Sequence, residues 1–273
     1  MTLDPKTVER IITSIKNNSN YDFSNYSRKS LNRRLTRIIT EYKITVNELC
    51  IKLQNNKDFL EKVVKDITVN TTEFFRDPDL WNFIKKSVLP YIKHKKNINI
   101  WHAGCSNGQE LYSMMILLAE NNILDNANFY GSDLNTDIIQ KAKNGKYKLF
   151  LNETFNENLS KVFDNSDKIK SKYFDINFSK DIVSIKPNLL KKPKYFIHDL
   201  VKQTDFTDKK FDIIFCRNVL IYFDLNLQNK IFRYFYEKIN KNGFLIIGLH
   251  EAIFGKELKL FNQLKYQVYK KIK

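Results

Sequence analysis

Apolar side chains in the first 70 residues recur every three or four positions, which is the spacing of amphipathic helices. The first stripe begins after Asp4-Pro5, a pair typical of a helix start because Asp caps the helix and Pro occupies its first turn. The same periodicity predicts further helices over residues 27–42, 46–53 and 57–64. We therefore expect a small all-α domain over residues 1–68.

The pattern of residues 69–90 predicts a connection between two domains. Residues 69–76 are polar and aromatic without a clear period, which indicates a linker. Asp77-Pro78 then repeats the cap-and-proline start, and the apolar residues that follow it have helical spacing. We expect this linker to lead directly into one connecting helix.

From residue 97 the pattern changes to short apolar runs that alternate with helical segments. Helices are predicted after the first, second and fourth runs, and this alternation is typical of a mostly parallel sheet covered on both faces. Residues 148–193 are irregular, with short strand-like pieces, and we expect an inserted antiparallel β-subdomain there. The α/β domain is expected over residues 91–273. The predicted strands are 98–103, 128–132, 195–198, 211–216, 244–249 and 266–270.

Composition narrows the class of protein. The net charge of +16 would attract nucleic acid, an anionic membrane or an acidic protein. The alternative is that Lys is simply a favoured surface residue in this protein and has no binding role. No apolar run approaches the roughly 18 residues of a membrane span, and the N-terminus lacks a signal-peptide pattern. The cysteines, Cys50, Cys105 and Cys216, are odd in number and scattered, which disfavours disulfides and a zinc site. We expect a cytoplasmic protein without membrane insertion.

The positions of the glycines indicate where a ligand could bind. All 7 glycines fall after residue 100. Gly104 and Gly108 lie in a tight loop between the first predicted strand and its helix, without the G-x-G-x-x-G spacing of dinucleotide sites. Asp133 ends the next strand, where an acidic residue typically accepts hydrogen bonds from ribose hydroxyls. The alternatives are a structural turn and an Asp that caps the next helix, a task that Asn135 could also perform. A nucleoside ligand without a phosphate loop suggests S-adenosylmethionine.

Arg217 and Asn218 interrupt the apolar segment "FDIIFCRNVLIYFD" (211–224). A ligand site at the end of a central strand would explain them. The alternative is an exposed Arg followed by an Asn that caps a helix. The histidines are too dispersed to define a metal site, so we expect no metal.

A series of motifs, taken together, resembles the chemotaxis protein methyltransferases of the CheR family, which methylate chemoreceptor glutamates. The resemblance covers most of the chain and implies a helical N-terminal domain, a linker, and a Rossmann-like α/β methyltransferase domain that binds S-adenosylmethionine and carries a small β-subdomain. The motifs are "YSRKSLNRRLTRI" (26–38), "NTTEFFRD" (70–77), "AGCSNGQELYS" (103–113), "GSDLN" (131–135), "AKNGKY" (142–147), "FCRNVLIYFD" (215–224) and "NGFLIIGLHEAI" (242–253).

The resemblance also implies the site residues. Arg76 and Arg217 would organise the cofactor and the incoming carboxylate. The usual Glu-Glu-Pro-Tyr is here Gln109-Glu110-Leu111-Tyr112, so Gln109 is the alternative to Glu110, and "GLHEAI" replaces the usual Gly-His-Ser-Glu. The implied cofactor contacts are Asn70, Thr72, Arg76, Ala103, Gly104, Glu110, Asp133, Asp199, Leu200, Arg217 and Asn218.

The implied partners are the acidic cytoplasmic helices of transmembrane chemoreceptors, and the implied by-product is S-adenosylhomocysteine. Lys29, Arg33, Arg34 and Arg37 on the basic helix 27–42 would contact these receptor helices, although a basic helix face can also be simply solvated. We expect a monomer and no nucleic-acid partner. Two other functions remain as alternatives, a non-catalytic S-adenosylmethionine-binding scaffold or sensor and a nucleic-acid methyltransferase.

Overall fold

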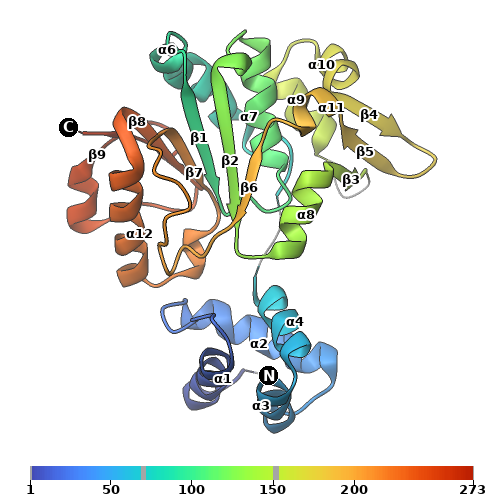
Figure 1. Cartoon of the computed structure of the whole chain (residues 1–273), viewed down its shortest axis with the longest axis vertical. Coiled ribbons are helices and arrows are strands. Elements are labelled where there is room, and N and C mark those ends of the chain that lie inside the picture. Colours follow the sequence, from blue (N-terminus) through green and yellow to red (C-terminus); the bar gives the residue numbers. More distant parts are fainter. Residues whose placement is uncertain (1, 69–71, 150–153, 273) are drawn as a thin grey trace. The chain divides into compact units, whose positions relative to one another are not determined.

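The computed structural model describes residues 2–68, 72–149 and 154–272. The chain divides into two compact units, each treated by itself below. The helical unit comprises Met1–Val69 together with Val219–Ile231, and the α/β unit comprises Asn70–Asn218 together with Phe232–Lys273 (Figure 1).

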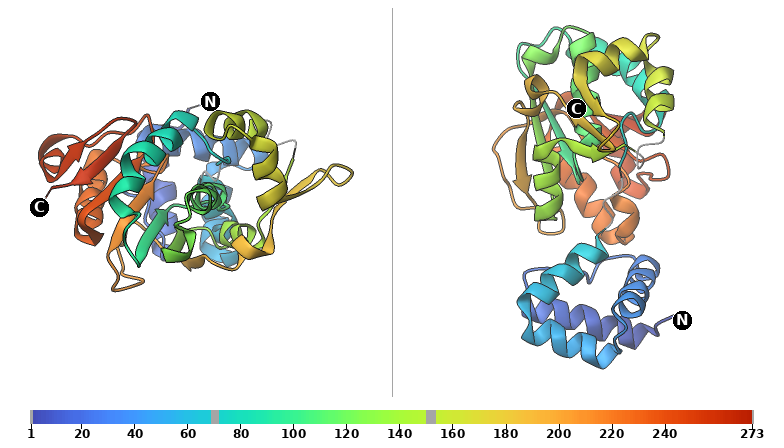
Figure 2. Two further views of the ribbon diagram at one scale, coloured as in Figure 1. Left: turned by 90° about the horizontal axis from the view of Figure 1, so that it is seen from above. Right: turned by 90° about the vertical axis from the view of Figure 1, so that its right-hand side faces the viewer.

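The helical unit confirms the predicted helices, each with slightly different ends. They pack around one apolar core into a bundle (Figure 2). Side-chain caps explain their starts: Asp4 Oδ1 accepts a hydrogen bond from Thr7 N at 3.0 Å, and Thr45 forms a capping box with Glu48. The helices are α1 (Pro5–Asn18), α2 (Arg28–Tyr42), α3 (Val46–Asn55) and α4 (Lys57–Ile67).

A distant segment, Val219–Ile231, belongs to the same helical unit. The backbone N–H of Ser27 donates to the carbonyl of Tyr222 at 2.8 Å. The ring of Tyr26 meets Phe223 edge-on, with centroids 4.9 Å apart. The hydrophobic pattern of the sequence gives no sign of this long-range pairing, because backbone hydrogen bonds of this kind leave no periodicity.

The α/β unit is built on a sheet with strand order β6-β2-β1-β7-β8-β10-β9. The strands from β6 to β8 run parallel, and β10 pairs antiparallel with both β8 and β9. The expectation of a mostly parallel sheet is confirmed, but β8 starts earlier than predicted and the short edge strand β9 was missed. The strands are β1 (Ile98–Ala103), β2 (Ala127–Asp133), β6 (Lys194–Ile197), β7 (Phe211–Cys216), β8 (Ile239–Ile247), β9 (Phe261–Gln263) and β10 (Val268–Lys271).

Both faces of this sheet are covered, which explains why the central strands are apolar at almost every position. On one face Ile100 and Phe215 share a core with α7 (Gln109–Glu120). On the other face Trp101 packs against Phe211 at 5.3 Å and against Phe235 at 5.5 Å, centroid to centroid. Other helical elements of the two units are α8 (Thr136–Asn144), α12 (Leu225–Lys238), η2 (Leu124–Asn126), η4 (Leu220–Tyr222) and η5 (Gly255–Leu260).

The described part of the linker is packed into the α/β unit. Phe74 and Phe75 are fully buried in its core, and Phe75 adopts a left-handed backbone conformation with φ of 51°. The N–H of Phe75 donates to Ser113 Oγ at 2.9 Å, and this hydroxyl donates to the carbonyl of Gln109 at 2.9 Å. The connecting helix is α5 (Pro78–Phe83), a π-helical turn (Ile84–Val88) and α6 (Leu89–Ile92), where one regular helix was expected.

The β-subdomain is a separate antiparallel sheet with order β3-β5-β4, which confirms the predicted insertion. It projects from the α/β unit beside α9 and α10 (Figure 1). Phe74 of the linker contacts Tyr147, Phe155 and Phe174 edge-on, so it joins this subdomain to the unit. The elements are β3 (Lys146–Lys148), α9 (Phe155–Val162), α10 (Ser166–Tyr173), β4 (Phe174–Asn177), β5 (Ile182–Ile185) and α11 (Pro187–Leu190).

The cysteines Cys50, Cys105 and Cys216 are free and buried. Within the described ranges, no helix combines the length and the apolar character needed to cross a membrane.

Replacement of Ser113 by Ala tests the anchoring of the linker. It leaves the buried N–H of Phe75 without an acceptor, and we expect a loss of about 1–3 kcal/mol in the stability of the α/β unit. Urea unfolding followed by tryptophan fluorescence reports this unit alone, because Trp81 and Trp101 are the 2 tryptophans of the chain and both lie within it. The exposed Ser160, which donates to the carbonyl of Glu157, is the matched control, and a Ser160→Ala midpoint shift as large as that of Ser113→Ala would contradict the prediction.

Candidate functional site

Several of the predicted cofactor residues lie at one edge of the sheet. Because β1, β2, β6 and β7 are parallel, their carboxyl ends meet at the same edge, where ligands of open α/β sheets bind. Ala103 ends β1, Asp133 ends β2, and Arg217 follows β7. Asp199 comes two residues after the end of β6.

Arg217 is the centre of this edge. Its side chain is only 1% exposed, and its guanidinium donates to Glu110 Oε2 at 2.8 Å and to Asp77 Oδ2. The alternative of an exposed Arg at a strand end is therefore wrong. A buried guanidinium held by two carboxylates is stable only when its partners stay in place, because an unpaired buried charge is costly.

Glu110 is held from two sides. Its Oε1 lies 3.0 Å from His102 Nδ1, and the ring of His102 stacks on Phe215 with centroids 4.4 Å apart. Burial by itself raises the pKa of Glu110, but the charge of Arg217 and the contact with His102 outweigh burial and lower it. Glu110 is therefore ionised at neutral pH, and the carboxylate facing Arg217 comes from Glu110, while Gln109 precedes it in α7.

Asp77 corrects an expectation. The sequence predicts that its side chain caps the helix that starts at Pro78. In the structure Asp77 occupies the cap position with φ of 59° but makes no capping hydrogen bond, and its carboxylate pairs with Arg217 instead. The Asp-Pro signal locates the helix start correctly, but a pairing across 140 positions of sequence leaves no local trace.

The glycine loop is shaped largely by the protein itself. Gly104 and Gly108 have φ of 72° and 87°, conformations that glycine adopts without strain. A Cβ on Gly108 would lie 3.0 Å from Ala142 Cβ and 3.1 Å from Tyr195 Oη, so tight packing and the backbone conformation together favour glycine there. The alternative of a structural turn thus accounts for glycine at residue 108. Gly104 directly follows the end of β1.

Asp133 is not the helix cap. Asn135 caps α8, with its Oδ1 accepting from the backbone N–H of Asp137 at 3.0 Å. The carboxylate of Asp133 accepts from Ser106 N and from Asn135 N, both at 3.0 Å, and each oxygen keeps a further lone pair. Burial raises the pKa of Asp133, although these backbone hydrogen bonds oppose the shift.

The other predicted contacts are less constrained. Asp199 is half-buried, its Oδ1 accepts from Val201 N at 2.9 Å, and burial raises its pKa. Leu200 is buried and Thr72 half-buried, whereas Asn70 lies outside the described residues. The Arg76 side chain is 33% exposed, and its Nε lies 3.9 Å from Glu73 Oε1. Its backbone carbonyl accepts a hydrogen bond from Trp81 Nε1 at 2.9 Å.

This edge fits a cationic nucleoside. Asp77, Glu110 and Arg217 together carry one net negative charge when ionised, which suits a sulfonium. Among the described residues, Ser106 Oγ and Arg217 Nε are buried side-chain atoms without a hydrogen-bond partner, so both could still meet a ligand. Over the same residues, no group of three or more His, Cys, Asp or Glu side chains is placed to hold a metal ion.

The predicted receptor-contacting residues divide into two kinds. Lys29, Arg33 and Arg37 are exposed on α2, and Arg37 pairs with Glu41 at 2.6 Å. Arg34 is half-buried, so it does not share their exposed position. Across the described part of the chain, Lys29 and Arg33 form no ion pair, and their charges are therefore available to a partner.

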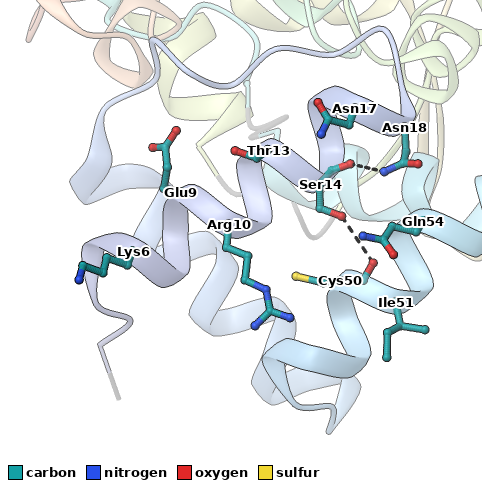
Figure 3. A pocket seen from close by; sticks show the side chains of 10 residues that line it. All are labelled: Lys6, Glu9, Arg10, Thr13, Ser14, Asn17, Asn18, Cys50, Ile51 and Gln54. Atoms are coloured by element: carbon teal, nitrogen blue, oxygen red, sulfur yellow. Dashed lines mark hydrogen bonds between the residues drawn. The ribbon is translucent and has the colours of Figure 1, made fainter.

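The helical unit has a hollow of about 530 Å³ between α1 and α3. Figure 3 shows polar side chains around it, including Lys6, Arg10, Asn17 and Gln54. None of the predicted cofactor or receptor-contacting residues lines this hollow, so it is not the site built by the motifs.

Known protein families match both the N-terminal helical region and the α/β region of the chain. The family model for the CheR methyltransferase SAM-binding domain matches residues 70–270, and the CheR all-alpha domain matches residues 6–68. A chemotaxis protein methyltransferase of Borreliella burgdorferi is 31% identical over 267 residues, covering 91% of this chain and 88% of the relative. One from Listeria innocua is 28% identical over 242 residues, with coverages of 88% and 87%.

Among solved structures, the plantazolicin methyltransferase BpumL in complex with pentazolic desmethylPZN analog and SAH is 14% identical to this chain, with a TM-score of 0.39, and the match covers 74% of this chain and 61% of that chain. The family models together span nearly the whole sequence, as do the two relatives. The chain therefore belongs to the CheR methyltransferases, with an all-α N-terminal domain and an α/β domain that binds S-adenosylmethionine.

Proposed function

We propose that this protein methylates glutamate side chains of chemoreceptors, converting carboxylates to methyl esters and releasing S-adenosylhomocysteine. The observation that carries the proposal is the buried guanidinium of Arg217 held by Asp77 and Glu110 at the strand ends, in a chain of the CheR family. The relatives from Listeria innocua and Borreliella burgdorferi are named chemotaxis protein methyltransferases, which supports a receptor as the substrate. In this proposal residues 1–68 contact the receptor, 69–90 connect, and 91–273 bind the cofactor, with the β-subdomain at about 148–193.

The residues at the sheet edge have distinct roles toward the cofactor. Asp133 accepts hydrogen bonds from the ribose hydroxyls through the lone pairs that Ser106 and Asn135 leave unused. Glu110, kept ionised by Arg217, supplies negative charge beside the cationic end of the ligand. The remaining proposed contacts are Asn70, Thr72, Arg76, Ala103, Gly104, Asp199, Leu200 and Asn218.

The chemistry requires no general base. When bound, S-adenosylmethionine supplies a methyl group activated by its sulfonium. A glutamate carboxylate, with an ordinary pKa near 4.3, is already ionised at neutral pH and attacks this methyl group with loss of a thioether and no proton. Opposite charges neutralise each other in this step, so alignment and exclusion of water by the protein accelerate it.

Arg217 and Arg76 have different roles in the proposed reaction. Arg217 is held by two carboxylates and acts on the cofactor side, where it holds Glu110. Arg76 is partly exposed, and its Nε lies 3.9 Å from Glu73 Oε1, longer than a hydrogen bond, so its guanidinium can bind the incoming carboxylate. Neither arginine exchanges a proton in this mechanism.

The exposed cations of α2 face the receptor. Receptor segments that present several glutamates are acidic, and Lys29, Arg33 and Arg37 provide a basic helix face for them, with Arg34 beside it. The protein acts as a monomer in the cytoplasm, where these segments of the receptor are accessible.

Incubation with methyl-labelled S-adenosylmethionine and receptor-containing membranes, followed by alkali, tests the reaction. We expect label on the receptor that alkali releases as volatile methanol, because carboxyl methyl esters are hydrolysed under these conditions. Label that resists alkali would indicate another acceptor atom, and an unlabelled receptor despite cofactor binding would indicate a non-catalytic binding protein. Either result would overturn the proposed function.

Charge reversal at Arg33 tests the receptor-binding face. In Arg33→Glu we expect KM for the receptor to rise about tenfold while the cofactor dissociation constant stays unchanged, because a repulsive contact replaces an attractive one. Initial rates and calorimetry measure the two quantities. Lys6→Glu makes the same charge change at an exposed site on α1, and it should leave both values within about twofold. Equal losses in the two variants would show a net-charge effect alone.

The pH dependence of cofactor affinity tests Asp133. Its carboxylate accepts ribose hydrogen bonds only when ionised, and burial raises its pKa above the ordinary 3.8. Affinity is therefore full above this raised pKa and falls as pH drops through it, by about tenfold or more for hydrogen bonds to a charged group. Calorimetry with S-adenosylhomocysteine between pH 8 and pH 4 should show this decline in affinity. The Asp133→Asn variant should bind weakly at every pH and should lack the decline that is due to protonation of Asp133. Identical profiles in both proteins would contradict the ribose role.

A further inference from the structure

The carboxylate of Glu251 is buried in the α/β unit, and the mechanism above does not use it. Glu251 is 5% exposed and follows β8. Its Oε2 accepts hydrogen bonds from two backbone N–H groups, that of Gly248 at 2.6 Å and that of Asn218 at 3.0 Å. One carboxylate oxygen therefore joins the segments that follow the neighbouring parallel strands β7 and β8.

The N–H from Asn218 belongs to a residue in an unusual conformation. Asn218 has φ of 60°, a left-handed conformation that costs most side chains about 1–2 kcal/mol and that Asn tolerates better than most. It directly follows Arg217, so a change of backbone conformation at Asn218 would displace Arg217 relative to its partners Glu110 and Asp77. The N–H of Asn218 donates to the carboxylate of Glu251, which favours the observed conformation, and hydrogen bonds to charged acceptors are the stronger kind.

Gly248 shows how closely the two segments approach. A Cβ at this position would lie 2.7 Å from Glu251 Oε2, 2.9 Å from Asn218 N and 3.0 Å from Asn218 Nδ2. These distances are shorter than any normal contact, so a side chain at residue 248 would push Glu251 and Asn218 apart. Gly248 and the carboxylate of Glu251 thus act together to fix the Arg217–Asn218 turn.

Cys216 lies next to this turn but does not take part in it. Burial raises the pKa of its thiol well above the ordinary value, and the negative charges of Glu251 and Glu110 raise it further. The thiol therefore stays protonated, which leaves the carboxylate of Glu251 as the group that acts on the turn.

We infer that Glu251 is a positioning residue for the cofactor: it holds Asn218 in its left-handed conformation and thereby keeps the Arg217–Asn218 turn in place at the binding site. This inference rests on the proposed assignment of Arg217 and Asn218 to the cofactor. Glu251 acts through these neighbours and needs no contact with the reacting atoms.

Substitutions at Glu251 test the inference through binding of S-adenosylhomocysteine, measured by calorimetry on the full-length protein. Glu251→Ala should weaken binding about tenfold or more, because both N–H groups lose their acceptor. Glu251→Gln keeps an acceptor oxygen of the same reach and should recover most of that loss. Gly248→Ala should weaken binding to a similar degree, and the double variant Gly248→Ala/Glu251→Ala should be little worse than either single one.

Glu257→Gln is the matched control, since Glu257 is 1% exposed in the same unit and pairs with Arg233 at 2.9 Å. We expect it to lower the urea midpoint without changing affinity. Wild-type affinity in Glu251→Ala, or equal loss of affinity in Glu257→Gln, would overturn the inference. These outcomes are separate from the proposed reaction, because absence of alkali-labile methyl groups on the receptor would refute the reaction while leaving the binding result intact.

Discussion

The arrangement of the site depends on one buried cation. The guanidinium of Arg217 is almost inaccessible to water and donates to Glu110 and Asp77, which come from α7 and from the start of α5. Burial of a charge is tolerable only when its partners are supplied with good geometry. The end of β7, the first turn of α7 and the linker must therefore adopt their positions together, and the charges that organise the site also fix the backbone around it.

The linker can fulfil this condition because its apolar residues belong to the core. Phe74 packs against the β-subdomain, and Phe75 is buried with its N–H bound to Ser113. These contacts hold Asp77 near the sheet edge. A segment that reads as an irregular connection is thus a structural part of the α/β unit, and its lack of periodicity reflects contacts to several different elements rather than the absence of structure.

The sequence predicts features that depend on local spacing and misses those that depend on distant pairs. Helix periodicity, apolar strand runs and the loop with Asp133 are local, and the resulting expectations of fold were correct. The pairing of Asp77 with Arg217 and the role of Glu251 at the turn of Asn218 join residues far apart in the sequence. A capping Asp and an ion-paired Asp look the same in one sequence, so only the folded chain separates them.

In the proposed function the two reactants have opposite charges, and the protein meets each with its complement. The chain as a whole carries +16, yet the cluster around Arg217 has a net negative charge when its carboxylates are ionised. The exposed cations of α2 act over distances that salt limits to roughly 8 Å at physiological ionic strength, whereas buried charges are screened much less. In this proposal surface charge governs encounter with an acidic receptor, while the carboxylates around the buried Arg217 govern retention of a cationic cofactor. A uniformly basic surface would serve the first task and oppose the second, so the proposal requires acidic groups at the sheet edge.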